Sequence, residues 1–361
     1  QFIAIRINKK SRIPYIKSLT NAWGDKLKGK LIKSLGKYRF DEIAGGIQLH
    51  AEKLIVDFIK GYVHIAHCKN LAFAGGVFMN IKLNQQIKSS LGKDFTYTTV
   101  PSCGDESLVF GSWAVGQLER CSYNSNQLLA RNISDAFDPY KVGLYMGTAY
   151  ENTSIEQILQ ERVEELENHN IKFKKVANPE KLLATYLSNN KICARFSGRM
   201  EWGARSLGNR SILANPSEIF NLRKINKAIK CRDFWMPFAP SINEEYVTDY
   251  LDIPNHSLKD YYFMQVGANT LEKTRTSLCC AIHQYDYTAR PQIVVNKINP
   301  KYHLLIEEFK AMTGIGGILN TSFNLHGYPV VENPNQAIDV FIESGLEVLQ
   351  LENYVLAKIV L

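Results

Sequence analysis

The pattern of apolar and polar positions changes character near Phe40. Residues 1 to about 40 are rich in Lys, Ser and Gly and predict an irregular or weakly helical lead-in. After Phe40, apolar residues recur at helical spacing from Ile43 to Ile59, which predicts a helix with one buried face that ends near Gly61.

Short apolar runs then alternate with helical segments. Residues 71–74 and 95–100 predict buried strands, each followed by a turn sequence that contains glycine. Helices are predicted over 80–87 and 107–118. This alternation of helices and strands predicts α/β architecture.

A polar, irregular stretch over residues 121–141 predicts a domain boundary, which divides the chain into residues 1–140 and 141–361. Two domains also suit the length of 361 residues, because a single core rarely keeps growing to this size. The second domain is predicted to contain strands at 142–146 and 191–196, helices near 154–169 and 179–189, an apolar run at 315–319 and a final strand at 354–360.

The predicted strand at 191–196 leads into a segment with four arginines in 16 residues, namely Arg195, Arg199, Arg205 and Arg210. Glycines interrupt the segment, and Glu201 is the one acid among the arginines. The planar guanidinium group matches phosphate and carboxylate oxygens two at a time. Glycine lets backbone N–H groups approach an anion. The segment predicts an anion pocket for a phosphorylated substrate, and a basic surface loop is the alternative.

Further polar motifs follow in the same half of the chain. Lys230 and Arg232 precede a rigid Pro-x-x-Pro element at 237–240, which indicates fixed positive charge facing a pocket. Residues 320–324 (N-T-S-F-N) can hold phosphate oxygens or a carbamoyl amide, or can form a plain Asx turn. A third polar cluster consists of Asp286, Thr288, Arg290 and Gln292.

The first half offers weaker signals. The pair Gly75-Gly76 lies between a predicted strand and a helix, where glycines serve either phosphate approach or a packing turn. Asp105 follows the next strand and can cap the following helix or ligate a metal. His64 and His67 have no third ligand nearby in sequence, which disfavours a metal site at this pair.

Composition narrows the partners. The net charge of +8 fits anionic small molecules and gives no specific support to nucleic acid. Seven cysteines without C-x-x-C spacing favour a reducing compartment. There is no apolar run of membrane-span length and no signal peptide pattern, so we expect a cytoplasmic protein without a membrane segment.

Four strings, at residues 71–80, 198–213, 230–241 and 320–324, together resemble the O-carbamoyltransferase family, which includes nodulation-factor, cephem and aminoglycoside carbamoyltransferases. The resemblance runs from about residue 40 to the end of the chain. It implies an α/β fold in which the C-terminal lobe of an ASKHA-type (actin-like ATPase) domain occupies residues 1–140. A YrdC-like α/β domain, related to threonylcarbamoyl-AMP synthases, would occupy residues 141–361.

The same resemblance implies a two-step reaction. The second module makes carbamoyl-adenylate from carbamoyl phosphate and ATP, with release of pyrophosphate and phosphate. The first module, similar to universal tRNA-threonylcarbamoyltransferases, transfers the carbamoyl group to a hydroxyl group of a small-molecule acceptor such as a natural product or a sugar. Developing charge at the phosphates would be stabilised by preorganised cations.

The resemblance also assigns roles residue by residue. The implied catalytic residues are Arg199, Arg205, Arg210, Lys230, Arg232 and Ser322. The implied cofactor-binding residues are Gly75, Gly76, Asn80, Asn209 and Asn324, to which we add Arg290 from the third polar cluster. Asp105 matches a ligand of Fe(II) or another divalent metal, and Mg²⁺ is a further candidate beside the phosphates.

Departures from the family pattern define what the chain lacks. Ala204 and Ser206 stand where Pro and Ala are usual, and Met236 stands where Arg is common. The His-x-x-x-His metal motif of the family's N-terminal lobe is absent, so we expect a second chain or a further segment to supply that lobe. The alternatives are an enzyme of the tRNA-threonylcarbamoylation type and a non-catalytic nucleotide-binding subunit.

Overall fold

The computed structural model describes residues 3–7, 14–18, 24–92, 94–109, 111–112, 115–116, 138–230, 233 and 236–358. The chain forms two compact units, residues 1–100 and 101–361. This division lies before the predicted boundary near residue 140, which stays a prediction because residues 117–137 are not described. Among the described residues, no helix is long and apolar enough to cross a membrane.

The first unit opens with an antiparallel pair of strands, β1 (Ile3–Ile7) and β2 (Pro14–Ser18), followed by helix α1 (Gly24–Leu35). The prediction of an irregular or weakly helical lead-in is therefore wrong for β1 and β2, whereas α1 agrees with its helical form. In β1, the isoleucines alternate with other residues at a period of two, which is the strand pattern that the abundant lysines and serines obscured.

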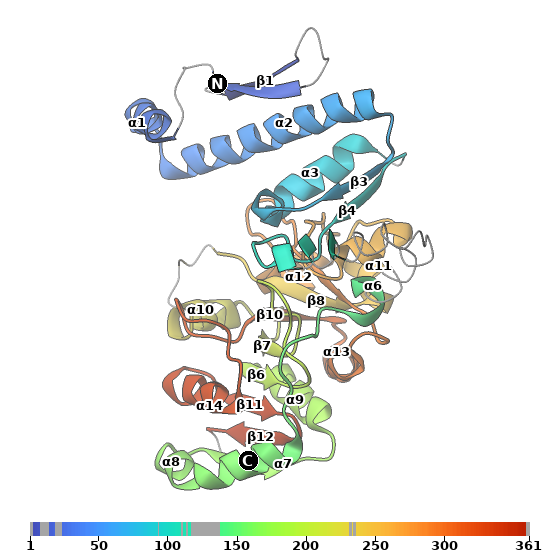
Figure 1. Ribbon diagram of the computed structural model, residues 1–361. Coiled ribbons are helices and arrows are strands. Elements are labelled where there is room, and N and C mark those ends of the chain that lie inside the picture. The colour runs from blue at the N-terminus through green and yellow to red at the C-terminus, as the bar shows by residue number, and fades with distance from the viewer. Residues whose placement is uncertain are drawn as a thin grey trace. The chain divides into compact units, whose positions relative to one another are not determined.

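The rest of the first unit follows the predicted order of elements. Helix α2 (Phe40–Ala66) is followed by β3 (Asn70–Phe73), the 3₁₀ turn η1 (Gly76–Met79), α3 (Ile81–Leu91) and β4 (Thr96–Thr99). The two strands pair in parallel, and α2 contacts α3 (Figure 1). Helix α2 passes through Gly61, the predicted end, because its apolar spacing continues to Ile65.

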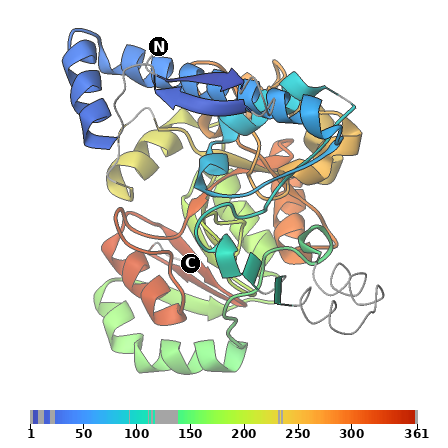
Figure 2. The same ribbon diagram turned by 45° about the horizontal axis from the view of Figure 1, so that its top comes forward.

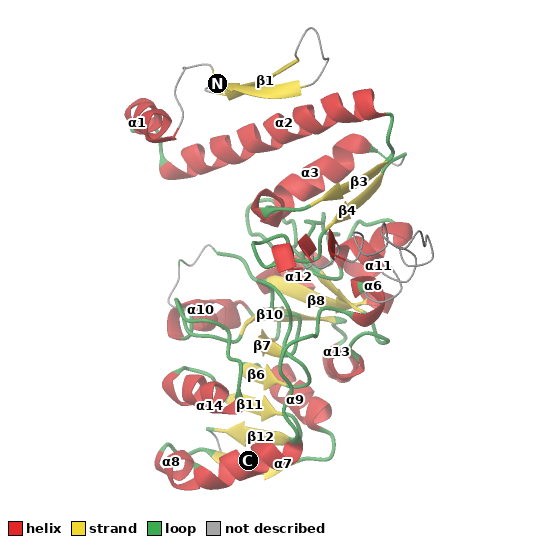
Figure 3. Ribbon diagram, in the orientation of Figure 1, coloured by secondary structure: helices red, strands yellow, loops and turns green. Residues whose placement is uncertain are grey.

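An eight-stranded mixed sheet forms the second unit, with the strand order β5-β12-β11-β6-β7-β10-β8-β9 (Figure 3). The mixed α/β architecture is thus confirmed, while the ASKHA-type assignment stays a prediction. The strands are β5 (Lys172–Lys175), β6 (Cys193–Phe196), β7 (Arg210–Ala214), β8 (Ala239–Asn243), β9 (Gln292–Val294), β10 (Gly317–Ser322), β11 (Val348–Leu351) and β12 (Tyr354–Ala357).

Helices cover both faces of this sheet. One core joins the sheet to α7 (Asn152–Glu161), α10 (Ile219–Ala228) and α14 (Pro334–Glu343), and the opposite core joins it to α9 (Pro179–Ser188) and α13 (Pro300–Thr313). Figure 2 shows the same separation, with the red α14 and the orange α13 on opposite sides of the strands. Strands β6, β7, β8 and β11 are consequently buried along their whole length.

Short helices complete the unit. They are α6 (Pro139–Val142), α8 (Val163–Asn168), η2 (Glu244–Tyr246), α11 (Val247–Tyr250), η3 (Asn255–Tyr261), α12 (Thr274–Ser277) and η4 (Cys279–Ala281). The predicted helix near 154–169 is divided into α7 and α8 at Arg162. The predicted helix at 179–189 and the strands at 191–196 and 354–360 are confirmed over the described residues as α9, β6 and β12.

The predicted strand at 142–146 is wrong. Gly143, at φ 77°, ends helix α6, and the chain beyond it joins no sheet. Its backbone instead meets the arginine-rich segment, because Leu144 O accepts from Trp202 N at 2.7 Å and Thr148 O accepts from Met200 N at 2.9 Å. The apolar residues at 142–146 therefore belong to a segment that lies along the arginine-rich loop and not to a strand of the sheet.

Candidate functional site

Three of the predicted motifs of the second unit meet at one end of the central strands of the sheet. Strand β6 ends beside the start of β7, with Phe196 opposite Arg210. Strand β10 ends beside the same point, with Ser322 opposite Ser211, and β8 begins beside β10. The loop 197–209 between β6 and β7, the N-T-S-F-N string and the approach to β8 therefore share this end (Figure 1). We call this end of the central strands, with the loops that leave it, the arginine edge.

The loop 197–209 is organised around a buried carboxylate. Glu201 Oε1 accepts hydrogen bonds from Leu207 N and Asn209 N, both at 2.7 Å, and from Arg210 N at 3.2 Å. Glu201 is only 7% exposed, so these amide groups have no water to replace the carboxylate. Glu201 shapes the loop from inside.

Asn209 is a second internal tie. Its Oδ1 accepts from Arg195 Nη1 at 3.0 Å and from Asn299 Nδ2 at 2.9 Å, while its Nδ2 donates to Arg199 O at 2.8 Å. Arg195 is fully buried and also lies 3.5 Å from Glu180 Oε1. The Asn209 amide therefore holds the loop, a task that does not depend on a ligand.

Arg210 is the most enclosed of the predicted catalytic arginines. Its Nη1 donates to Asn209 O at 3.0 Å, its Nη2 donates to Thr148 O at 3.1 Å, and its guanidinium group lies 3.5 Å from the ring centre of Phe196. Burial lowers the pKa of Arg210 to about 10, so the group is charged at neutral pH but poorly solvated. A bound anion would compensate this buried positive charge.

The other two arginines of the loop differ in exposure. Arg199 is exposed and donates to Met146 O at 3.0 Å. Arg205 is half-buried, and burial lowers its pKa. Gly203, at φ 97°, passes so close to Ser102 that a Cβ atom there would overlap Ser102 Oγ, which fixes this part of the loop against residues 102–106.

Lys230, Ser322 and Asn324 form a compact cluster at the arginine edge. Lys230 Nζ lies within hydrogen-bonding distance of four oxygens, namely Ser322 O at 2.5 Å, Ser322 Oγ at 3.1 Å, Asn324 O at 3.0 Å and Asn324 Oδ1 at 2.6 Å. Ser322 Oγ also lies 2.7 Å from Asn324 Oδ1. The structure thus brings together residues from two predicted motifs that lie about 90 positions apart in the chain. Arg232, the partner of Lys230 in the motif, lies outside the described residues.

The third polar cluster is divided by the structure. Asp286 and Thr288 form a local turn, with Thr288 N donating to Asp286 Oδ1 at 3.0 Å. Gln292 instead enters the sheet interior, where its Oε1 accepts from Ser241 Oγ at 2.7 Å and from Asn320 Nδ2 at 3.1 Å. Arg290 lies between them and is half-buried.

Glu352 binds the start of the loop 197–209. Its carboxylate accepts from Gly198 N, from Ser197 Oγ at 3.1 Å and from Lys301 Nζ at 2.9 Å. Burial alone would favour the neutral acid, but the hydrogen bonds from Lys301 and Gly198 hold the pKa of Glu352 below its ordinary value. This carboxylate therefore stays charged and pins the start of the loop.

The predicted nucleotide residues of the first unit lie on one turn. Gly75 adopts φ 100° before η1, and Gly76 begins η1. Asn80 caps α3, accepting from Leu83 N at 3.1 Å, and its Nδ2 donates to Gln48 Oε1 at 2.8 Å. In the structure, Asn80 thus serves as a helix cap and as a tie to α2.

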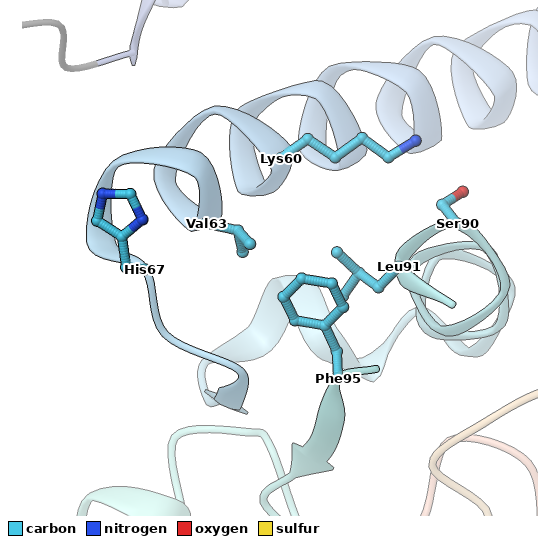
Figure 4. Close-up of a pocket in the computed structure, with 6 residues that line it drawn as sticks. All are labelled: Lys60, Val63, His67, Ser90, Leu91 and Phe95. Carbon is cyan, nitrogen blue, oxygen red and sulfur yellow. The ribbon is translucent and has the colours of Figure 1, made fainter. Parts of the chain in front are cut away.

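A pocket of about 410 Å³ lies elsewhere in the first unit, between the ends of α2 and α3 (Figure 4). Val63, Leu91 and Phe95 give it an apolar floor, and its rim carries Lys60, His67 and Ser90. It contains none of the predicted site residues.

Asp105 is exposed and lies before a helical stretch at 107–109. Among the described residues, one group of three side chains could together ligate a metal, namely Glu245, His303 and Glu307. Asp105 is not a member of this group. The described residues around Asp105 therefore do not make an iron site on their own.

Comparison with known proteins gives a family match for this part of the chain. Residues 184–358 match the family model described as carbamoyltransferase C-terminus. The chain carries a carbamoyltransferase C-terminal domain. This domain begins within α9 and includes the whole arginine edge.

Relatives extend the match beyond the carbamoyltransferase C-terminal domain. An uncharacterized protein of Methanocaldococcus jannaschii is 30% identical over 92% of this chain and 60% of its own length. Nodulation protein NolNO of Sinorhizobium fredii is 28% identical over 88% of this chain and 44% of its own length. The 3'-hydroxymethylcephem-O-carbamoyltransferase of Amycolatopsis lactamdurans is 32% identical over 40% of this chain and 26% of its own length.

The chain spans about half the length of the curated relatives it matches. A solved structure of full-length HypF is 15% identical, with a TM-score of 0.34 over 48% of this chain, and this likeness is too weak to bear on the fold or the site.

Sequence reasoning missed the residues that shape the carbamoyltransferase C-terminal domain from within. Glu201 was visible inside the arginine segment, but its role depends on a loop that folds back onto one carboxylate oxygen. Glu352 lies 154 residues beyond Gly198, and no local motif marks it. Asn299 contacts Asn209, and the Tyr302 ring lies beside Arg195. Both contacts depend on how α13 packs, which no local motif marks.

Proposed function

We propose that this chain is part of an O-carbamoyltransferase and supplies its carbamoyl-adenylate-forming module. The substrates of this module are carbamoyl phosphate and ATP. The acceptor of the carbamoyl group is a hydroxyl group of a small molecule, such as a natural product or a sugar. The match of residues 184–358 to the carbamoyltransferase C-terminus supports the class of reaction.

The cluster of Lys230, Ser322 and Asn324 carries the proposal. A buried ammonium group, a hydroxyl group and an amide group converge at the same end of the central strands as the arginine loop. Lysine binds phosphate as a point charge, and arginine adds paired donors. This combination suits two phosphorylated substrates held side by side.

The chemistry follows from charge. Water attacks the carbonyl carbon of carbamoyl phosphate, and the bond from that carbon to the bridging oxygen breaks. Carbamate and inorganic phosphate form, and one proton is released to the solvent. A carbamate oxygen then attacks the α-phosphorus of ATP, the bond to the β-phosphate breaks, and pyrophosphate leaves with its electron pair. Both nucleophile and electrophile are anionic, so fixed cations such as Lys230 and Arg210 lower the barrier by stabilising the charge in the transition state.

The remaining predicted ligands belong to the transfer step. In this proposal, the turn with Gly75, Gly76 and Asn80 contacts the nucleotide, and Asp105 is one ligand of a metal whose other ligands come from a lobe with a His-x-x-x-His motif. A second chain or a further segment would provide that lobe. The proposed location is the cytoplasm.

Pyrophosphate release tests the proposal. Purified chain with ATP is expected to release pyrophosphate when carbamoyl phosphate is added, and not when threonine and bicarbonate are added instead. Release that depends on threonine would support the threonylcarbamoylation alternative. Tight ATP binding with no pyrophosphate release under either condition, even with a partner that carries the missing lobe, would contradict the proposal and support a non-catalytic subunit.

A further inference from the structure

A second cluster of ligand-type side chains lies at the other end of β8. Glu245 comes from η2, directly after β8, and His303 and Glu307 come from α13. His303 Nε2 lies 2.9 Å from Glu245 Oε2 and 3.1 Å from Glu245 Oε1. One ligand atom from each of the three residues lies within 4.8 Å of the others. These distances are those of side chains that face a common centre.

The spacing on α13 explains part of this convergence. His303 and Glu307 are four positions apart, so they lie one above the other on the same helix face. The N-cap Asn299, which accepts from Tyr302 N at 3.1 Å, begins α13 one turn earlier and sets the direction in which this face points. Glu245 meets the face from η2.

Asn243 provides an independent observation. Its amide reaches the cluster, with Nδ2 donating to Glu307 Oε1 at 2.6 Å and to His303 O at 3.1 Å. Asn243 is fully buried, and its Oδ1 has no hydrogen-bond partner within the described part of the chain. A buried carbonyl oxygen without a partner costs free energy, so this amide is held in an unfavourable setting in which its Nδ2 fixes the Glu307 carboxylate.

An ion pair alone explains less of the arrangement. A protonated His303 would compensate the charge of Glu245, but Glu307 would still place a second carboxylate within 4.8 Å of both groups. Tyr246 OH donates to Glu307 Oε2 at 2.9 Å, which adds a hydrogen bond without adding positive charge. A divalent cation compensates both carboxylates and uses a neutral imidazole nitrogen as a ligand.

We propose that Glu245, His303 and Glu307 bind one divalent first-row transition metal ion, with Asn243 holding the Glu307 carboxylate through its Nδ2 hydrogen bond. One imidazole and two carboxylates form a donor set that suits Zn²⁺. This site is separate from Asp105 and does not depend on the proposed carbamoyl chemistry. The metal ties η2 to α13, and α13 in turn holds the arginine loop through the hydrogen bond from Asn299 to Asn209.

Zn²⁺ binding to the full chain, without an affinity tag and after removal of metal by a chelator, tests the site. We expect one saturable site by calorimetry, with a rise in the melting temperature. Glu245→Gln is the main variant, because Glu245 is exposed and the change leaves no buried charge unpaired. It should weaken binding by about tenfold or more, and His303→Gln should do the same.

Two control variants separate this site from the alternatives. Glu308→Gln removes a carboxylate from the same helix outside the cluster, and Asp105→Asn removes the predicted ligand of the other metal. Both should retain Zn²⁺ binding. The proposal is overturned if the wild-type chain shows no saturable site, or if Glu245→Gln and His303→Gln, shown to be folded by circular dichroism, bind Zn²⁺ as tightly as Glu308→Gln.

Discussion

At the scale of single residues, the arginine edge depends on acids as much as on bases. Glu201 and Glu352 are both buried, and the carboxylate oxygens of both accept hydrogen bonds from the loop that carries the arginines. Hydrogen bonds to a charged acceptor are stronger than those between neutral groups. Because backbone amides occupy the oxygens of these acids, neither acid forms an ion pair with the exposed Arg199 or the half-buried Arg205.

Replacement of Glu201 by Ala should loosen the loop. Three amide groups would lose their acceptor in a buried place, which should cost about 3 kcal/mol of the free energy of unfolding. Hydrogen exchange at Leu207, Asn209 and Arg210 should become faster, as measured by mass spectrometry or NMR. Glu164→Ala, an exposed change on α8, should leave these amides unaffected. Unchanged exchange in Glu201→Ala would show that the carboxylate does not organise the loop.

Among the elements, α13 connects the sheet to the loop. Its first turn carries Asn299, which reaches Asn209, and Lys301, which reaches Glu352. Tyr302 on the same turn lies 5.5 Å from the guanidinium group of Arg195. Gly208, at φ 109°, leaves the space that the Tyr302 ring occupies. The position of this helix therefore determines the position of the arginines.

The tie between α13 and Glu352 should give the protein an acid-sensitive step. The pKa of Glu352 is lower in the folded state than in the unfolded state, so its contribution to stability is present above the ordinary carboxyl pKa of about 4.3. That contribution is lost as the pH falls through the depressed value. In a series of urea unfolding curves, Glu352→Gln should be less stable than wild type at pH 7 and should lose less stability toward pH 3. Glu343→Gln, an exposed change on α14, should follow wild type. A parallel acid dependence in wild type and Glu352→Gln would contradict this assignment.

Elements whose apolar spacing is set locally were predictable. Helices α2 and α9 and strands β6 and β12 follow from periodicity and from turn residues at their ends. The strand predicted at 142–146 failed because its apolar residues pack against a loop rather than a sheet. The strand character of β7 was hidden by its position directly after the arginine segment, where charge and glycine suggested only a loop.

For the whole molecule, the sequence motifs indicated which residues belong to the site but not how they are joined. The convergence of Lys230 with Ser322 and Asn324 depends on β10 ending beside the start of β7, a pairing between segments more than 100 residues apart that no local pattern encodes. The carbamoyltransferase C-terminus accounts for residues 184–358, and the resemblance found in the strings at 198–213 and 320–324 is confirmed by that match.

The most direct test of the central claim is the rate of carbamoyl-phosphate-dependent pyrophosphate release in chains altered at Lys230. Lys230→Gln removes the cation at the centre of the arginine edge, whereas Lys227→Gln removes an exposed lysine from the neighbouring helix α10. With both variants shown to be folded by circular dichroism, we expect Lys230→Gln to lower the rate by about 100-fold or more and Lys227→Gln to retain the wild-type rate. Equal rates in the two variants would contradict the assignment of the arginine edge as the site of carbamoyl-adenylate formation.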